Sequence, residues 1–190
     1  MNLLKIFMML MSVTTSPTSE AYIDLAAIAT TSCKNAKEQN IDPNVINGLI
    51  RIEMSFNPPH ELQGMLLAAA CSESGFKATQ RGDKHLSKSG KHPMAHGMLQ
   101  LWPWWERAYD IDRDDWEESA RAWMTHISSM IPKVKKQCHI KNRDSKRLWS
   151  KAWVRGIRSR KPGGRCNETA KHEYLLRRWH KRCKRCGDGI

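Results

Sequence analysis

Glu73 is the residue whose type and position are best suited to chemistry in this sequence. It follows Leu66 by seven residues and Ala70 by three, so on a helix its carboxyl group emerges at the edge of the apolar face. Gly75 is placed to end that helix, and both the carbonyl end of a helix and partial burial disfavour a charged carboxylate. A carboxyl group that keeps its proton can serve as a general acid, so we expect acid/base chemistry at Glu73.

A second conspicuous segment begins 24 residues later and reads Gly97-Met98-Leu99-Gln100-Leu101-Trp102-Pro103. Preceded by Glu73-Ser74-Gly75-Phe76, it resembles the soluble lytic transglycosylases and their goose-type lysozyme relatives. Those families carry E-S-x-F at the end of a helix and then a G-[LM]-[ML]-Q segment. A looser match is Ala152-Trp153-Val154-Arg155-Gly156, similar to the family motif A-Y-N-A-G. The resemblance covers roughly residues 41–160.

The resemblance implies the fold, the reaction and the site residues. It implies a lysozyme-like helical domain that cleaves the β-1,4 bond between N-acetylmuramic acid and N-acetylglucosamine in peptidoglycan, with Glu73 as catalytic acid/base. The substrate-binding residues that it implies are Ser74, Gly97, Met98, Gln100, Trp102 and Trp153. We expect a lytic transglycosylase, which needs no second carboxylate because the substrate's own N-acetyl and 6-hydroxyl groups complete the reaction.

Asp83 leaves a hydrolytic alternative open. It is the only carboxylate between Glu73 and Glu106, and an inverting hydrolase needs a second carboxylate about 6.5–9.5 Å from the acid to activate water. Asp83 could position that water in a muramidase, or it could be a turn residue after Gly82 that bonds local backbone.

Eight tryptophans are unusually many for this length, and three of them, Trp102, Trp104 and Trp105, follow Gln100 directly. Aromatic faces stack well on sugar rings, so we expect Trp102 and one of the other two to line the groove, with the remaining tryptophans in the core.

Glu53 is a competing candidate for the acid. The string Glu53-Met54-Ser55-Phe56-Asn57-Pro58 also looks like the family's E-S-x-F-N-P motif. Because Met54 stands at the serine position and Glu53 lies 44 residues before Gly97, we assign Glu53 to packing or to a buried hydrogen bond.

Apolar residues recur at helical spacing, so the fold class expected is mainly α, with a short irregular or hairpin insert at residues 76–96. Asp42 and Pro43 mark the start of one helix, which Pro58 and Pro59 end. The other helices are expected at residues 61–74, 98–108, 114–136, 144–156 and 168–182, and Pro162-Gly163-Gly164 separates the last two.

Residues 1–21 have the pattern of a signal peptide, with Lys5, an apolar stretch over 6–13 and small residues before the expected cleavage near Ala21. Residues 22–190 then form a single exported domain, periplasmic or extracellular, with a basic C-terminal helical extension. Six cysteines suit disulfides in such a compartment. The pairs preferred are Cys33–Cys71, Cys138–Cys166 and Cys183–Cys186. A zinc site at Cys183 and Cys186 is the less favoured alternative.

The net charge of +13 is uneven, because residues 133–190 hold 20 Lys and Arg against 4 Asp and Glu. Such a surface attracts polyanions. For an exported protein we expect the anionic cell-wall surface and peptidoglycan glycan strands as partners, and no nucleic acid. We expect a monomer without metal or cofactor. A basic helical binding protein without activity remains the non-enzymatic alternative.

Overall fold

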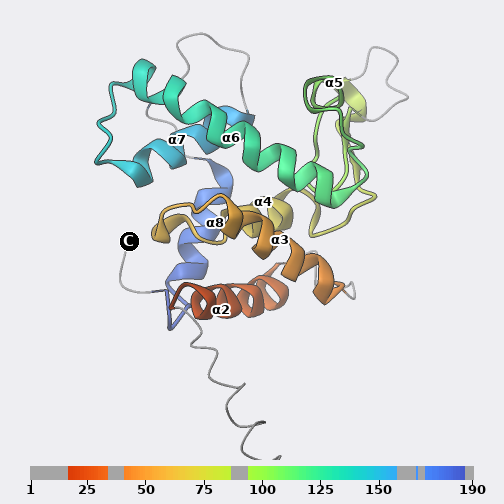
Figure 1. Ribbon diagram of the computed structural model, residues 1–190. Helices are drawn as coiled ribbons and strands as arrows, with labels where there is room; N and C mark the ends of the chain where they lie inside the picture. The colour runs from red at the N-terminus through yellow and green to blue at the C-terminus, as the bar shows by residue number, and fades with distance from the viewer. Residues whose placement is uncertain (1–16, 34–40, 87–93, 158–165, 167–169, 187–190) are drawn as a thin grey trace, which may run out of the picture.

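The computed structural model describes residues 17–33, 41–86, 94–157, 166 and 170–186, and this part of the chain is mainly helical, as predicted (Figure 1). Strands β1 and β2 form a short antiparallel pair. The elements in chain order are α2 (Pro17–Ser32), α3 (Pro43–Ser55), η1 (His60–Leu62), α4 (Met65–Ser74), β1 (Arg81–Gly82), η2 (Lys84–Leu86), β2 (Ala95–His96), α5 (Trp104–Tyr109), α6 (Trp116–Cys138), α7 (Ser145–Ile157) and α8 (Lys171–His180).

Helix α4 is the centre of the fold. Its side chains from Met65 to Ala70 are all apolar and expose at most 1% of their surface. A helix that is apolar on every side must be surrounded, and α2, α3 and α8 all pack against it. In Figure 1, α6 crosses one side of this group and α2 lies on the opposite side. Glu73 therefore stands where the last turn of the central helix leaves the core.

Side-chain caps begin both α3 and α6, and the cap at Asp42 was predicted from the sequence. The Asp42 carboxylate accepts a hydrogen bond from the backbone N–H of Asn44, and Pro43 occupies the first helical position. The Asp115 carboxylate accepts bonds from the N–H groups of Glu117 and Glu118. These local interactions fix where both helices enter the core.

The helix predicted over residues 61–74 is interrupted, and this prediction was wrong in its first part. A short 3-10 turn, η1, comes first, and Gly64 then adopts a left-handed conformation with φ +86° before α4 begins. A Cβ atom at Gly64 would lie 3.2 Å from a methyl group of Leu25 and 3.3 Å from one of Leu176. Glycine is thus required both by the backbone conformation and by the close approach of α2 and α8.

The helix predicted over residues 98–108 was also wrong in its first half. Residues 97–100 form a turn closed by the paired backbones of His96 and Leu101, and α5 begins only at Trp104. Gly97 and Gln100 both have positive φ angles, +73° and +49°. Upstream of this turn, β1 and β2 confirm the predicted hairpin insert, whose residues 87–93 lie outside the described part of the chain.

All three predicted disulfides are present. Cys33–Cys71 joins the residue after α2 to α4, Cys138–Cys166 joins the end of α6 to the segment before α8, and Cys183–Cys186 closes a local loop after α8. The Cα atoms of these pairs are 5.8, 5.6 and 5.4 Å apart. Persistent disulfides are typical of proteins in oxidising compartments.

The described helices include none that is both long enough and apolar enough to cross a membrane. Residues 1–16 of the predicted signal peptide, and the predicted Pro162-Gly163-Gly164 linker, lie outside the described residues. The expected cleavage point near Ala21 falls within α2, where Ala21 is completely buried. Cleavage there stays a prediction.

Candidate functional site

Glu73 lies in the last turn of α4, and Gly75 ends the helix in a left-handed conformation with φ +65°. The Glu73 side chain is 33% exposed, although residues 65–71 and Ser74 of the same helix are buried. Ser74 is buried. Its hydroxyl group donates a hydrogen bond to the carbonyl oxygen of Ala70 and accepts one from the N–H of Lys77. The sequence therefore presents one carboxyl group to solvent from an otherwise buried helix, and Ser74 holds the turn that follows it.

The Glu73 carboxyl group is held by His172, in the first turn of α8. The Nε2 atom of His172 is hydrogen-bonded to Oε1 of Glu73, and the histidine side chain itself is only 5% exposed. The Nδ1 atom of this ring is buried and has no hydrogen-bond partner in the described part of the chain. An imidazole bonded to a carboxyl group fixes its orientation and can share its proton.

Trp153 packs against the ring of His172. The two rings stack with their centroids 5.8 Å apart and their planes 24° apart, and Trp153 meets the edge of Trp123 at 6.2 Å. The resemblance placed Trp153 among the substrate-binding residues, and in this structure its side chain has no exposed surface. Its connection with Glu73 runs through His172, which it holds in place.

The Gly-x-x-Gln segment forms a second group of contacts around the side chain of Gln100. Its Nε2 atom donates to the carbonyls of Gly97, at 2.8 Å, and Gln80, at 3.2 Å. A Cβ atom on Gly82 would lie 2.2 Å from Oε1 of Gln100, so glycine at this position makes room for the amide. Gln100 thus holds the hairpin and the following turn together.

Gly97 is fixed by its surroundings as much as by its backbone angle. A Cβ atom there would lie 1.9 Å from the carbonyl oxygen of Arg113, and its N–H donates to the carbonyl of Gln80. Met98, the next residue, is 1% exposed and belongs to the core. In this structure Gly97 and Met98 shape the backbone, and neither offers a side chain to a ligand.

Asp83 and Trp102 contact each other across the hairpin. The indole Nε1 of Trp102 donates to Oδ2 of Asp83 at 3.1 Å, and both side chains are half-buried. Asp83 has a φ of +54°, typical of a residue in a tight turn. The carboxylate considered for water activation therefore has a structural partner, an interaction that the sequence did not indicate.

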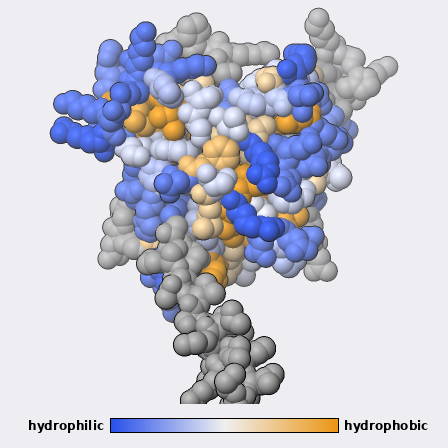
Figure 2. Space-filling model, viewed as in Figure 1, coloured by the Kyte–Doolittle hydropathy of each residue, from blue (hydrophilic) through white to orange (hydrophobic). Residues whose placement is uncertain are grey.

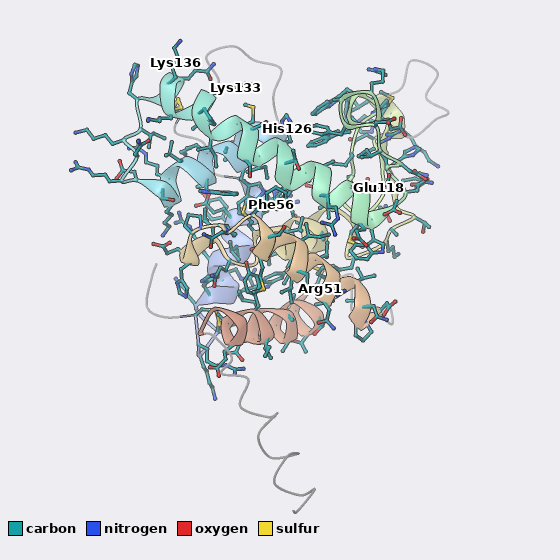
Figure 3. The ribbon with its side chains drawn as sticks, in the orientation of Figure 1. Arg51, Phe56, Glu118, His126, Lys133 and Lys136 are labelled. Atoms are coloured by element: carbon teal, nitrogen blue, oxygen red, sulfur yellow. A yellow bond between two sulfur atoms is a disulfide. The ribbon has the colours of Figure 1, made fainter. Side chains whose placement is uncertain are left out.

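An aromatic cluster continues from Trp102 into α5. Trp104 stacks on Trp105 at 4.4 Å, and Trp105 stacks on Tyr109 at 5.3 Å. His126 on α6, labelled in Figure 3, packs edge-on against these rings and bonds the Tyr109 hydroxyl at 2.7 Å. Burial, with a smaller effect from Lys133, lowers the pKa of His126, so the ring stays neutral at pH 7. Trp105 is core, whereas Trp104 keeps partly exposed aromatic surface.

The predicted site residues thus fall into two groups. Glu73 and Trp153 meet through His172, and the second group contains Gly97, Gln100, Asp83 and Trp102. A short segment, residues 75–80, connects the two groups. It leads from the end of α4 to Gln80, whose carbonyl oxygen accepts hydrogen bonds from Gly97 and Gln100 of the second group.

His172 is the site residue that the sequence analysis missed. It is separated from Glu73 by 99 positions, and no local motif surrounds it. A signal was nevertheless present, because His172, Leu176 and Trp179 follow one another at helical spacing and all are buried.

Glu53 has the buried role expected for it. It is completely buried, and its two carboxyl oxygens accept bonds from the Tyr22 hydroxyl at 2.9 Å, the Gly64 N–H at 2.6 Å and the Leu66 N–H at 2.8 Å. Burial raises the pKa of Glu53 to about 7, although these hydrogen bonds act in the opposite direction. With no exposed surface, Glu53 cannot reach a substrate in this structure. It connects α2, α3 and the start of α4.

Among the described residues, no three His, Cys, Asp or Glu side chains lie close enough together to hold a metal ion. Cys183 and Cys186, considered for zinc, are bonded to each other. In comparisons with known proteins, the chain matches no protein-family model, no curated protein and no solved structure.

Proposed function

We propose that this protein cleaves the glycan strands of peptidoglycan at the bond between N-acetylmuramic acid and N-acetylglucosamine, with Glu73 as general acid and then base. The observation that carries the proposal is the placement of Glu73, a partly exposed carboxyl group at the end of a buried helix, oriented by the buried side chain of His172. A general acid must meet the glycosidic oxygen in a fixed geometry, and this pair supplies a fixed carboxyl group.

The reaction proposed is that of a lytic transglycosylase. Glu73 donates its proton to the glycosidic oxygen as the bond breaks, and the N-acetyl group of the muramic acid stabilises the developing charge at C1. The carboxylate of Glu73 then takes the proton of the muramic acid 6-hydroxyl, whose oxygen attacks C1 and closes the 1,6-anhydro ring. No water enters the products, and Glu73 ends protonated as it began.

Hydrolysis by a muramidase is the alternative for the same bond, with Asp83 positioning the water. We favour the lyase because the Asp83 carboxylate already accepts the Trp102 indole N–H. Export to the periplasm or the outside of the cell belongs to the same proposal, and the three disulfides support it.

The test is digestion of purified peptidoglycan, followed by mass spectrometry of the soluble products. Anhydro ends identify the lyase, and reducing ends identify the hydrolase. Glu73→Gln keeps the shape of the side chain but removes the transferable proton, so cleavage should fall by about 10²–10⁴-fold. Glu117→Gln, at an exposed position on α6 that pairs with Arg121, is the control and should keep wild-type activity.

Two results would overturn the proposal. A folded Glu73→Gln protein with undiminished activity would remove Glu73 from the mechanism. A wild-type protein that binds insoluble wall but releases no fragments would instead be the basic helical binding protein, whose affinity should fall steeply with salt.

A further inference from the structure

A cavity of ≈ 520 Å³ lies between α7, α8 and η1. In Figure 1, α7 lies above α8, and α7 also packs against η1. The volume is in the range of pockets that bind small ligands, about 300–1,000 Å³. Figure 2 shows hydrophilic side chains gathered at this end of the molecule, where α6 ends and α7 begins.

Most charged groups in the lining are cations. Four of them, Arg143, Lys146, Arg147 and Lys151, come from the start of α7 and the residues just before it, and Arg177 comes from α8. Guanidinium groups bind carboxylates through two parallel hydrogen bonds, and lysine supplies a compact positive charge. The lining is therefore suited to a ligand that carries carboxylates.

The wall that α8 contributes is built around a buried carboxylate. Glu173 is only 3% exposed, and it accepts bonds from the Ser150 hydroxyl at 2.5 Å and from Arg177 at 2.8 Å. These bonds tie α7 to α8 and hold the Arg177 guanidinium at the wall. A charged group this deeply covered is retained only when it is well paired, so the wall has a defined shape.

Carboxylates in the same lining help to select the ligand. Glu61 and Asp144 join Glu173 there, so three acids stand among five cations. A polymer dense in phosphate would be repelled by the acids, whereas an acidic peptide that also carries an ammonium group meets opposite charges at both kinds of residue.

The cavity and the Glu73 site lie on neighbouring faces of the same turn of α8. His172, which holds Glu73, and Glu173, which lines the cavity, are consecutive residues of α8. Consecutive residues of a helix point about 100° apart. An extended peptide of four residues spans about 13 Å, which is more than the diameter of one helix with its side chains, about 10–12 Å.

We propose that this cavity binds the acidic stem peptide of the peptidoglycan strand whose glycan lies at Glu73. The inference rests on the proposed function for the identity of the peptide, and on the cavity lining for its charge. The cations engage the free carboxylates of the stem, and Glu61 and Asp144 engage its ammonium group, so the protein binds the peptide as well as the sugar.

The test measures binding of the soluble tripeptide l-alanyl-γ-d-glutamyl-diaminopimelate by calorimetry. In Lys146→Glu/Arg147→Glu the affinity should fall at least tenfold. The matched control is Lys133→Glu/Lys136→Glu, which makes the same change in net charge on the outer surface of α6, where both lysines point away from the body (Figure 3). The control should bind the tripeptide as the wild type does.

Three results would overturn the inference: no binding by the wild type, equal losses in both double variants, or tighter binding of inorganic polyphosphate than of the tripeptide. The cavity variant should also raise KM, with little change in kcat, on peptide-bearing glycan but not on glycan stripped of peptides by an amidase. Failure of the proposed function is separate. A wild type that binds the tripeptide yet releases no fragments from peptidoglycan would refute the cleavage and leave the peptide site standing.

Discussion

Glu53 makes stability depend on pH in a direction that can be stated in advance. Its pKa is raised to about 7 in the folded protein, from 4.5 for an unperturbed group, because the carboxyl group is completely buried. Below pH 4.5 both the folded and the unfolded states hold the proton. Between pH 4.5 and 7 the unfolded chain loses it while the folded protein keeps it, so the free energy of unfolding falls as the pH rises. Above pH 7 the carboxyl group is ionised in both states.

The size of the effect follows from the same values. Each pKa unit corresponds to about 1.4 kcal/mol, so the free energy of unfolding should fall by about 3 kcal/mol across this window. For a chain of this length, 1 kcal/mol shifts Tm by about 2–4 °C, which gives a decrease of roughly 6–12 °C.

Glu53→Gln should abolish this slope. It should lower stability most at pH 4.5 and little or not at all above pH 7, where the wild type has itself lost about 3 kcal/mol. Its amide oxygen can still accept from Tyr22 and Gly64, but its nitrogen then faces the N–H of Leu66, which previously donated to the carboxyl group. A buried donor without an acceptor costs about 1–3 kcal/mol.

The assay is thermal unfolding of both proteins at half-unit steps from pH 4 to 8. Taking the difference between the proteins at each pH removes the contribution of groups common to both. Glu117→Gln, an exposed control, should reproduce the wild-type slope. The reasoning is refuted if the difference between wild type and Glu53→Gln is the same at pH 4.5 and pH 7. Below its Tm, Glu53→Gln should still cleave peptidoglycan.

Three further predictions concern the site and its scaffold. His172→Gln should lower kcat at least tenfold and change the pH profile of kcat. It should leave KM nearly unchanged, because it removes the partner of Glu73 and no substrate contact. A variant that loses stability but keeps its kcat would show that His172 is only structural. Gly97→Ala should destabilise the fold by about 2 kcal/mol or more, because the methyl group meets a backbone carbonyl at a positive φ, and denaturant unfolding would measure the loss. Removing the Cys33–Cys71 disulfide by a double serine substitution should cost about 2–4 kcal/mol in the same assay, and adding reductant to the double variant should then lower stability less than in the wild type.

Local chemistry was sufficient to predict much of this fold. The cap at Asp42 and the glycine after α4 depend on neighbouring residues alone, and they were read correctly from the sequence. The break at Gly64 was not predicted. It depends on Leu25 and Leu176, which approach from α2 and α8, and on the buried carboxylate that accepts the Gly64 N–H.

In the candidate site, too, the features that depend on neighbouring residues were predicted and those that depend on distant residues were not. Glu73 could be singled out because it follows an apolar run and precedes a glycine in its own helix, but its contact with His172 could not be predicted, because that contact joins distant segments. The turn before α5 was missed for a different reason. Gln100 holds a positive φ that its residue type does not favour, and it does so through bonds to Gly97 and Gln80 that form only when the hairpin folds.

The separation of Glu73 from His172 also affects when the site is completed during synthesis. A ribosome has made 171 of the 190 residues before it adds His172. Until α8 emerges, the central helix α4 lacks the cover that α8 provides, and the Glu73 carboxyl group lacks its partner. A nascent or prematurely terminated chain therefore carries the acid without the residue that orients it, so the complete pair forms only in a chain in which α8 has been made.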